Sequence, residues 1–171
     1  MSRIFFWMAF FIFTTTMSLG FMKNARADNK AIIGWLENVY LPEYDFKIRA
    51  KIDTGAKNSS IHATHIEYVG KGKGEGLRIR FKVMYRKDKY RTIEANVLRE
   101  VRIKKSRFIK RTRPEIEMEI CLGEVRKRIR VNLEERGGMN YRMILGRTAL
   151  EGDFLVDVSK VFVTKSQSRK E

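Results

Sequence analysis

The sequence predicts an all-β domain in which short strands form a barrel-like arrangement. Apolar and charged residues alternate in several segments, most clearly in residues 77–83, where every second side chain is apolar. Turn-forming residues separate these segments at short intervals. From residue 31 onward, no segment keeps an apolar period of 3.6 residues for long. These three observations together favour a barrel of short strands over a helical or mixed fold.

The first half of the domain is predicted to consist of short strands and turns. Residues 31–35 form a first strand, residues 38–45 a loop around Pro42, and residues 46–52 a strand whose apolar and basic residues alternate. A strand from residues 59–63 leads into residues 66–69. The glycine-rich run at 70–76 lacks the ending of a phosphate-binding loop and is predicted to be a hairpin loop. A turn at 86–89 joins strand 77–83 to strand 90–97.

The second half contains a basic stretch and a second hairpin. Residues 100–113 are the most basic part of the chain, and residues 113–122 and 125–133 pair as strands that turn at Gly123. Residues 136–138 form a turn, residues 143–145 a buried strand, and residues 148–151 one helical turn. Segments 154–156 and 160–163 close the domain. No internal repeat or linker interrupts residues 28–171, which indicates one domain.

Composition restricts the partners more than the fold. The 171 residues carry a formal net charge of +16, which favours anionic partners such as nucleic acid, acidic peptides, anionic lipid or polysaccharide. A solvated basic surface without a partner is the alternative. The single cysteine, Cys121, excludes an intrachain disulfide. We expect it to be a partly covered strand residue, with an intermolecular disulfide or a reactive thiol as alternatives.

Residues 1–27 have the pattern of a secretory signal peptide. Arg3 precedes an apolar run at residues 4–13, and Ala-Arg-Ala at 25–27 offers a cleavage site before Asp28. The prediction is a periplasmic domain of residues 28–171. Because residues 17–22 extend the apolar character, an uncleaved inner-membrane anchor facing the periplasm is the alternative. Export argues against nucleic acid as a partner, and no signature of a nucleic-acid-binding module is present.

Two motifs narrow the interpretation. The strand at 46–52 runs directly into Asp53-Thr54-Gly55-Ala56, and Ile144-Leu145-Gly146-Arg147 follows much later in the chain. An apolar strand that ends in Asp-Thr-Gly-Ala, with Ile-Leu-Gly-Arg downstream, resembles the retropepsin-like aspartic peptidases. The flanks at 53–63 and 132–150 resemble a bacterial branch that carries the label of ATP-dependent zinc proteases. The resemblance covers roughly residues 30–163 and implies a closed barrel, with one lobe per chain and at most one short C-terminal helix.

The resemblance also implies a chemistry. Aspartic peptidases use two carboxylates about 3 Å apart that share one proton and activate water without a covalent intermediate. This chain has one Asp-Thr-Gly sequence, so the pair requires a homodimer in which Asp53 faces Asp53 of a second copy. The resemblance gives Thr54 the role of locking the two loops together. Gly55 allows close approach of the substrate and supplies backbone hydrogen-bonding groups.

Further site residues follow from the same resemblance. Ala56, Ile144 and Leu145 are expected to contact the substrate, and Gly146 and Arg147 to be structural. The flap is expected within residues 100–112, at Lys105-Ser106-Arg107, and its basic character favours an acidic peptide substrate. Lys57 stands where retroviral enzymes have an acidic partner for the arginine of the later motif. We therefore expect Glu151 or Asp153 to pair with Arg147.

No cofactor is expected, despite the label of the bacterial branch. His62 and His65 are the only histidines, whereas a zinc site needs three or four ligands. His62 is expected to pack near the Asp53 loop, and ATP hydrolysis lacks a phosphate-binding motif. Two alternatives to an exported endopeptidase remain open. One is a non-catalytic periplasmic binding module that holds an anionic envelope polymer or acidic protein on its basic face, and the other is a membrane-tethered scaffold.

Overall fold

The computed structural model describes residues 29–70, 76–104, 110–135 and 137–165. The predicted signal peptide at 1–27 lies outside the described residues. The described chain forms ten strands and one short helix, α2 (Arg147–Leu150). The strands are β1 (Ala31–Leu41), β2 (Phe46–Ile52), β3 (Ser59–His62), β4 (Thr64–Val69), β5 (Arg78–Arg86), β6 (Lys89–Lys104), β7 (Lys110–Leu122), β8 (Val125–Glu134), β9 (Met143–Leu145) and β10 (Phe154–Val161).

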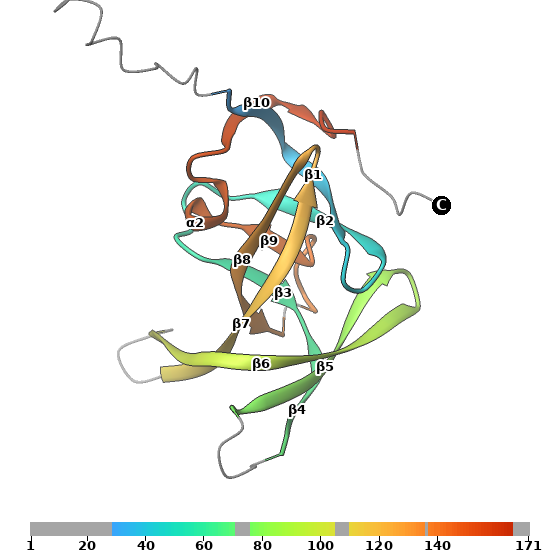
Figure 1. Cartoon of the computed structure of the whole chain (residues 1–171), viewed down its shortest axis with the longest axis vertical. Coiled ribbons are helices and arrows are strands. Elements are labelled where there is room, and N and C mark those ends of the chain that lie inside the picture. The colour runs from blue at the N-terminus through green and yellow to red at the C-terminus, as the bar shows by residue number, and fades with distance from the viewer. Residues whose placement is uncertain (1–28, 71–75, 105–109, 136, 166–171) are drawn as a thin grey trace, which may run out of the picture.

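Six of these strands close into a barrel. Their order is β1-β2-β9-β3-β8-β7, and a bridge between Tyr40 of β1 and Cys121 of β7 closes the ring. Strand β10 pairs in parallel with β1 at one edge, and β6, β5 and β4 extend from β7 at the other. In Figure 1 this extension lies at the opposite end of the molecule from β10. The prediction of an all-β closed barrel with one short helix is confirmed.

The alternation of the sequence places one face of each strand in the barrel. In β2, Ile48, Ala50 and Ile52 are buried, whereas Lys47 and Arg49 are exposed on the other face. In β7, Ile116, Met118, Ile120 and Leu122 contribute fully buried or nearly buried side chains. Burial of each large aliphatic side chain contributes about 1.5–3 kcal/mol to folding. The barrel interior is therefore the hydrophobic core that positions the connecting loops.

Three strands differ most clearly from the predicted boundaries. Strand β1 continues to Leu41 where a loop was expected from residue 38, because Val39 and Leu41 pair with Ile48 and Phe46 of β2 and are buried. Strand β6 does not end at residue 97 but continues to residue 104, inside the basic stretch predicted at 100–113, and its main chain pairs there with β7. Strand β10 is continuous from Phe154 to Val161 instead of two segments. In each case pairing with a neighbouring strand overrides the local sequence pattern.

A buried carboxylate that the sequence did not single out ties the C-terminal segment to β1. Glu37 is 0% exposed. Its Oε1 accepts from the backbone N of Gly34 (2.7 Å) and of Val163 (2.9 Å), and its Oε2 from the backbone N (3.3 Å) and Oγ1 (2.9 Å) of Thr164. These donors satisfy the carboxylate away from water. In the described part of the chain, no helix is long and apolar enough to span a membrane.

Candidate active site

The two motifs that the sequence singled out lie side by side. Strand β9, which carries Met143–Leu145, pairs in parallel with β2 on one side and antiparallel with β3 on the other. Asp53 follows β2 directly, and its backbone N donates to the carbonyl O of Leu145 at 2.9 Å. The end of β9 therefore fixes where the Asp53 loop leaves the barrel, although the motifs are about ninety residues apart in the chain.

The Asp53 loop is a tight turn that holds its own carboxylate. Oδ1 of Asp53 accepts from the backbone N of Gly55 (3.1 Å) and of Ala56 (3.3 Å), and the N of Ala56 also donates to the Asp53 carbonyl O (3.1 Å). Oδ2 lies 3.7 Å from Nζ of Lys51, and the carboxylate-bearing side chain is 28% exposed. One carboxylate oxygen is thus oriented by backbone donors, while the group remains accessible from outside the barrel.

Arg147 fastens the loop from the other side. Its Nη1 donates to the carbonyl oxygens of Thr54 and Gly55, both at 2.9 Å, and its backbone N donates to the Ala56 O at 2.9 Å. The structural role that the resemblance implies for Arg147 is therefore met through carbonyl groups. Neither acidic residue that we expected as its partner fills that role in the described chain: Asp153 instead forms an ion pair with Lys127.

Sequence reasoning missed three supports of the loop. The Ser59 Oγ accepts from the backbone N of Gly146 at 3.2 Å. Both the backbone N and Oγ1 of Thr148 donate to the Lys57 carbonyl O, each at 3.1 Å. The signal that could have found them is the position of two hydroxyl residues, one directly after the Asp53 loop and one directly after the second motif.

The other predicted site residues differ in accessibility. Ala56 and Ile144 are half-buried at the loop and at β9, so both can border a substrate. Leu145 is 0% exposed, so the structure gives it a positional role through its carbonyl instead of the predicted substrate contact. Thr54 is exposed, and within the described residues its hydroxyl has no hydrogen-bond partner. The predicted flap residues Lys105, Ser106 and Arg107 lie outside the described residues.

The two histidines and the cysteine lie on three different strands, β3, β4 and β7. His62 is buried at the end of β3, where its backbone N donates to the Arg142 O at 2.6 Å, and His65 is exposed. Cys121 is buried in β7, and this desolvation raises the pKa of its thiol. Over the described ranges, no three His, Cys, Asp or Glu side chains gather in a group that could hold a metal ion.

Comparison with known proteins identifies the family. The model of the RimB-like family, described as retropepsin-like aspartic endopeptidase RimB, matches residues 32–167, which include the Asp53 loop and Arg147. The chain belongs to the RimB-like family. The resemblance to retropepsin-like aspartic peptidases that the two motifs indicated is thereby confirmed. The description of the family gives the general class, an aspartic endopeptidase.

Solved and curated relatives add two further findings. A crystal structure of a Legionella pneumophila protein of unknown function superposes with a TM-score of 0.67 at 34% identity, covering 79% of this chain and 98% of that one. Proteins of Parasynechococcus marenigrum and Shewanella pealeana, each named "Probable alpha-L-glutamate ligase", are 36% and 35% identical over 75% and 80% of this chain. The chain spans less than a third of the length of these curated relatives, 28% and 30% respectively.

Proposed function

We propose that the protein is an aspartic endopeptidase whose active unit is a homodimer, with a catalytic pair made of Asp53 from each copy. The observation that carries the proposal is the Asp53 loop itself. Backbone donors orient its carboxylate, Arg147 fixes the loop by two carbonyl contacts, and the group stays accessible. Such a loop presents one carboxylate per chain, and a two-fold axis beside it would supply the second.

Exposed apolar side chains near the loop support an isologous contact. Strand β10 is at the edge of the sheet and exposes Leu155, Val158 and Val161, with Val158 at 78% exposure, and Ile32 of β1 pairs with Leu155. Unpaired apolar edge strands favour association with another chain. A hollow of about 410 Å³ lies between Thr54 and β10 and is lined by Thr54, Arg147, Leu150, Glu151, Phe154 and Val156. A second copy seated here would cover both features and offer a partner to the Thr54 hydroxyl.

The reaction follows from two carboxyl groups that share one proton. The ionised Asp53 takes a proton from a water molecule, while the protonated Asp53 of the other copy donates a hydrogen bond to the carbonyl oxygen of the peptide bond. Attack by the water oxygen gives a tetrahedral diol. Transfer of a proton to the nitrogen then breaks the C–N bond and releases an acid and an amine. No covalent bond forms between the enzyme and the substrate.

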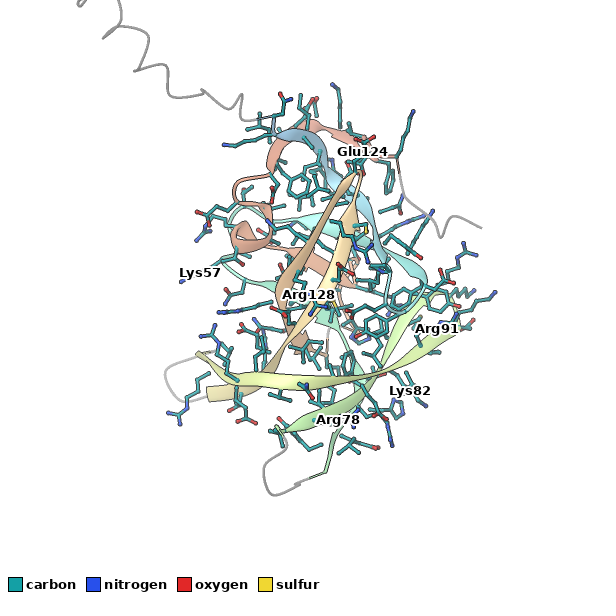
Figure 2. All side chains as sticks on the ribbon, in the orientation of Figure 1. Lys57, Arg78, Lys82, Arg91, Glu124 and Arg128 are labelled. Carbon is teal, nitrogen blue, oxygen red and sulfur yellow. The ribbon has the colours of Figure 1, made fainter. Side chains whose placement is uncertain are left out.

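The proposed substrates are acidic peptides, with glutamate as the residue of first choice. A hollow of about 430 Å³ begins directly after the Asp53 loop and is lined by Lys57, Asn58, Arg99, Glu115, Glu117, Arg128, Ile129, Arg130 and Thr148. Figure 2 shows Lys57 projecting from the loop and Arg128 on β8. Arg99 pairs with Glu115 and Arg128 with Glu117 in this hollow. The excess of basic side chains, with Lys57 and Arg130 outside these pairs, favours a carboxylate-bearing chain. The curated relatives named as glutamate ligases share this region, which is consistent with glutamate as a common substrate residue.

A specific observation also supports a second candidate, a binding module without hydrolysis. In the curated relatives, the region shared with this chain is under a third of a protein whose name states a ligase activity. A domain of this kind could hold a glutamate-containing chain for another activity. In both candidates we propose export to the periplasm, on the basis of the leader at residues 1–27.

One experiment separates the candidates. The full chain and Asp53→Asn would be compared for cleavage of glutamate-rich fluorogenic peptides, with the oligomeric state measured by light scattering. A dimer whose turnover falls at least about a thousand-fold in Asp53→Asn would support the peptidase. Cleavage unchanged in Asp53→Asn would refute the proposed pair. Peptide binding without cleavage in either protein would move the binding module to first place.

A further inference from the structure

A second basic hollow lies outside the Asp53 loop and shares none of the predicted site residues. Its volume is about 560 Å³, and four separate segments line it. Strands β1 and β2 contribute residues at 38 and 47–49, the end of β5 and the turn after it contribute residues 85–87, and the loop before β9 contributes residues 140–142. Arg91 and Lys82 mark the β5–β6 hairpin in Figure 2.

The charge of this hollow is unusually one-sided. Its lining includes Lys47, Arg49, Arg86, Lys87 and Arg142, and none of its residues is acidic. Arg86, Lys87 and Arg142 form no ion pair with any residue that the structure describes. In the hollow beside the Asp53 loop, by contrast, Glu115 pairs with Arg99 at 2.7 Å. Because like charges in one concavity repel, an anion bound there would relieve the repulsion and gain charge-assisted hydrogen bonds.

The walls of the hollow are held by contacts with the barrel. The carbonyl O of Arg142 accepts from the His62 backbone N at 2.6 Å. The ring of Tyr141 packs edge-on against Trp35 with centroids 6.0 Å apart, and the ring of Tyr85 lies 5.1 Å from that of Phe46. The cationic side chains therefore project from fixed backbone positions, which lowers the entropy cost of binding a ligand.

The hollow and the Asp53 loop are joined by one strand face. Arg49, Lys51 and Asp53 follow each other at every second position of β2 and the turn after it, with Nζ of Lys51 3.7 Å from Oδ2 of Asp53. Since a strand rises about 3.3 Å per residue, Arg49 lies about 13 Å before Asp53. An extended peptide would cover that distance with about four residues.

We infer that this hollow is an exosite that binds a carboxylate-rich segment of the peptide substrate, several residues away from the bond that is cut. The inference rests on the proposed peptidase function and extends it to a second contact. Single-stranded nucleic acid binds by stacking bases on aromatic rings, whereas both tyrosine rings here pack on Phe46 and Trp35. A lining with five cationic side chains and no acidic one matches a row of carboxylates better.

The test measures binding without cleavage. A fluorescein-labelled glutamate peptide of about eight residues, long enough to reach from Asp53 to the exosite, would be titrated against the full chain carrying Asp53→Asn. Two variants in this background, Arg86→Gln/Lys87→Gln and Arg142→Gln, remove exosite charge. The matched control, Lys82→Gln/Lys165→Gln, also removes two positive charges, from exposed positions outside the hollow that form no ion pair with any described residue.

We expect Kd to rise about five-fold or more in Arg86→Gln/Lys87→Gln, and less than about two-fold in the control. Equal weakening in the control would overturn the exosite, because only net charge would then matter. The exosite for peptide would also be overturned by a second result. In that result, an oligothymidylate of equal charge binds more tightly than the peptide, and Arg86→Gln/Lys87→Gln weakens binding of the oligothymidylate instead of the peptide. If the wild type does not cleave the peptide, the proposed peptidase function is refuted but the binding site is not. Peptide binding that depends on Arg86 and Lys87 would still establish the site.

Discussion

The backbone of Gly146 packs so closely against that of Asn58 that an added Cβ would lie 2.6 Å from the carbonyl carbon and oxygen of Asn58. These atoms belong to the main chain and cannot rotate away. The contact holds the segment after the Asp53 loop against the end of β9. A glycine at this position is therefore required by space and not by backbone conformation.

Gly146→Ala should destabilise the protein and displace the Asp53 loop. Overpacking of this kind costs typically about 1–3 kcal/mol in the free energy of unfolding, and here the clash is with rigid backbone. Urea denaturation would measure the cost. Gly138→Ala is the matched control, because a Cβ there meets no atom within 4 Å. Equal stability of the two variants would contradict the packing described here.

Arg147→Lys should impair turnover more than folding. Lysine keeps the charge but loses the planar guanidinium group through which Nη1 reaches the carbonyl oxygens of Thr54 and Gly55. We expect turnover of an acidic peptide to fall at least about ten-fold, with a loss of about 1 kcal/mol in stability. The amide NMR signals of Thr54 and Gly55 should shift. The control Arg126→Lys, at an exposed ion pair with Glu119, should change neither turnover nor the NMR signals of Thr54 and Gly55. Unchanged turnover in Arg147→Lys would show that Arg147 does not position the loop.

Glu37→Ala should loosen the C-terminal segment. The substitution leaves the buried backbone N of Gly34 and the part-buried backbone N of Val163 and Thr164 without their acceptor. We expect a loss of about 2–4 kcal/mol in the free energy of unfolding, because buried donors would lose bonds to a charged acceptor. Glu37→Gln retains an acceptor oxygen and should lose less. Hydrogen exchange at Val163 should accelerate in Glu37→Ala; exchange that stays slow would show that other contacts hold this segment.

Cys121 should resist thiol reagents until the protein unfolds. Burial raises the pKa of its thiol, so the folded state keeps the proton at pH values where the unfolded chain, with a pKa of about 8.5, begins to lose it. The free energy of unfolding should therefore decrease as the pH rises above about 8.5. Reaction with a disulfide reagent, followed with and without urea, tests the first point. Rapid modification of the native protein would favour the reactive-thiol alternative.

The sequence was sufficient for the parts of the fold that depend on local alternation and on turns. Strand β2, the turn of the hairpin at Gly123 and strand β9 were predicted within a residue, because each has a clear apolar pattern and a clear boundary. Strands β1 and β6 were predicted too short. Their continuations are stabilised by pairing with β2 and β7, and a partner strand leaves no mark in the local sequence.

For the candidate site, the sequence by itself predicted that Asp53 follows a strand in an Asp-Thr-Gly turn. It also predicted that Gly146 and Arg147 belong to the same site, because both sequence motifs consist of particular residue types in a fixed order. Only the tertiary structure decided what they contact. Arg147 binds the carbonyl oxygens of Thr54 and Gly55 instead of an acidic side chain, and Ser59 receives the backbone N of Gly146. The exosite residues come from four segments that the fold brings together. Such contacts depend on how distant strands pair, and a hydrogen bond to a backbone carbonyl requires no particular residue type at the acceptor.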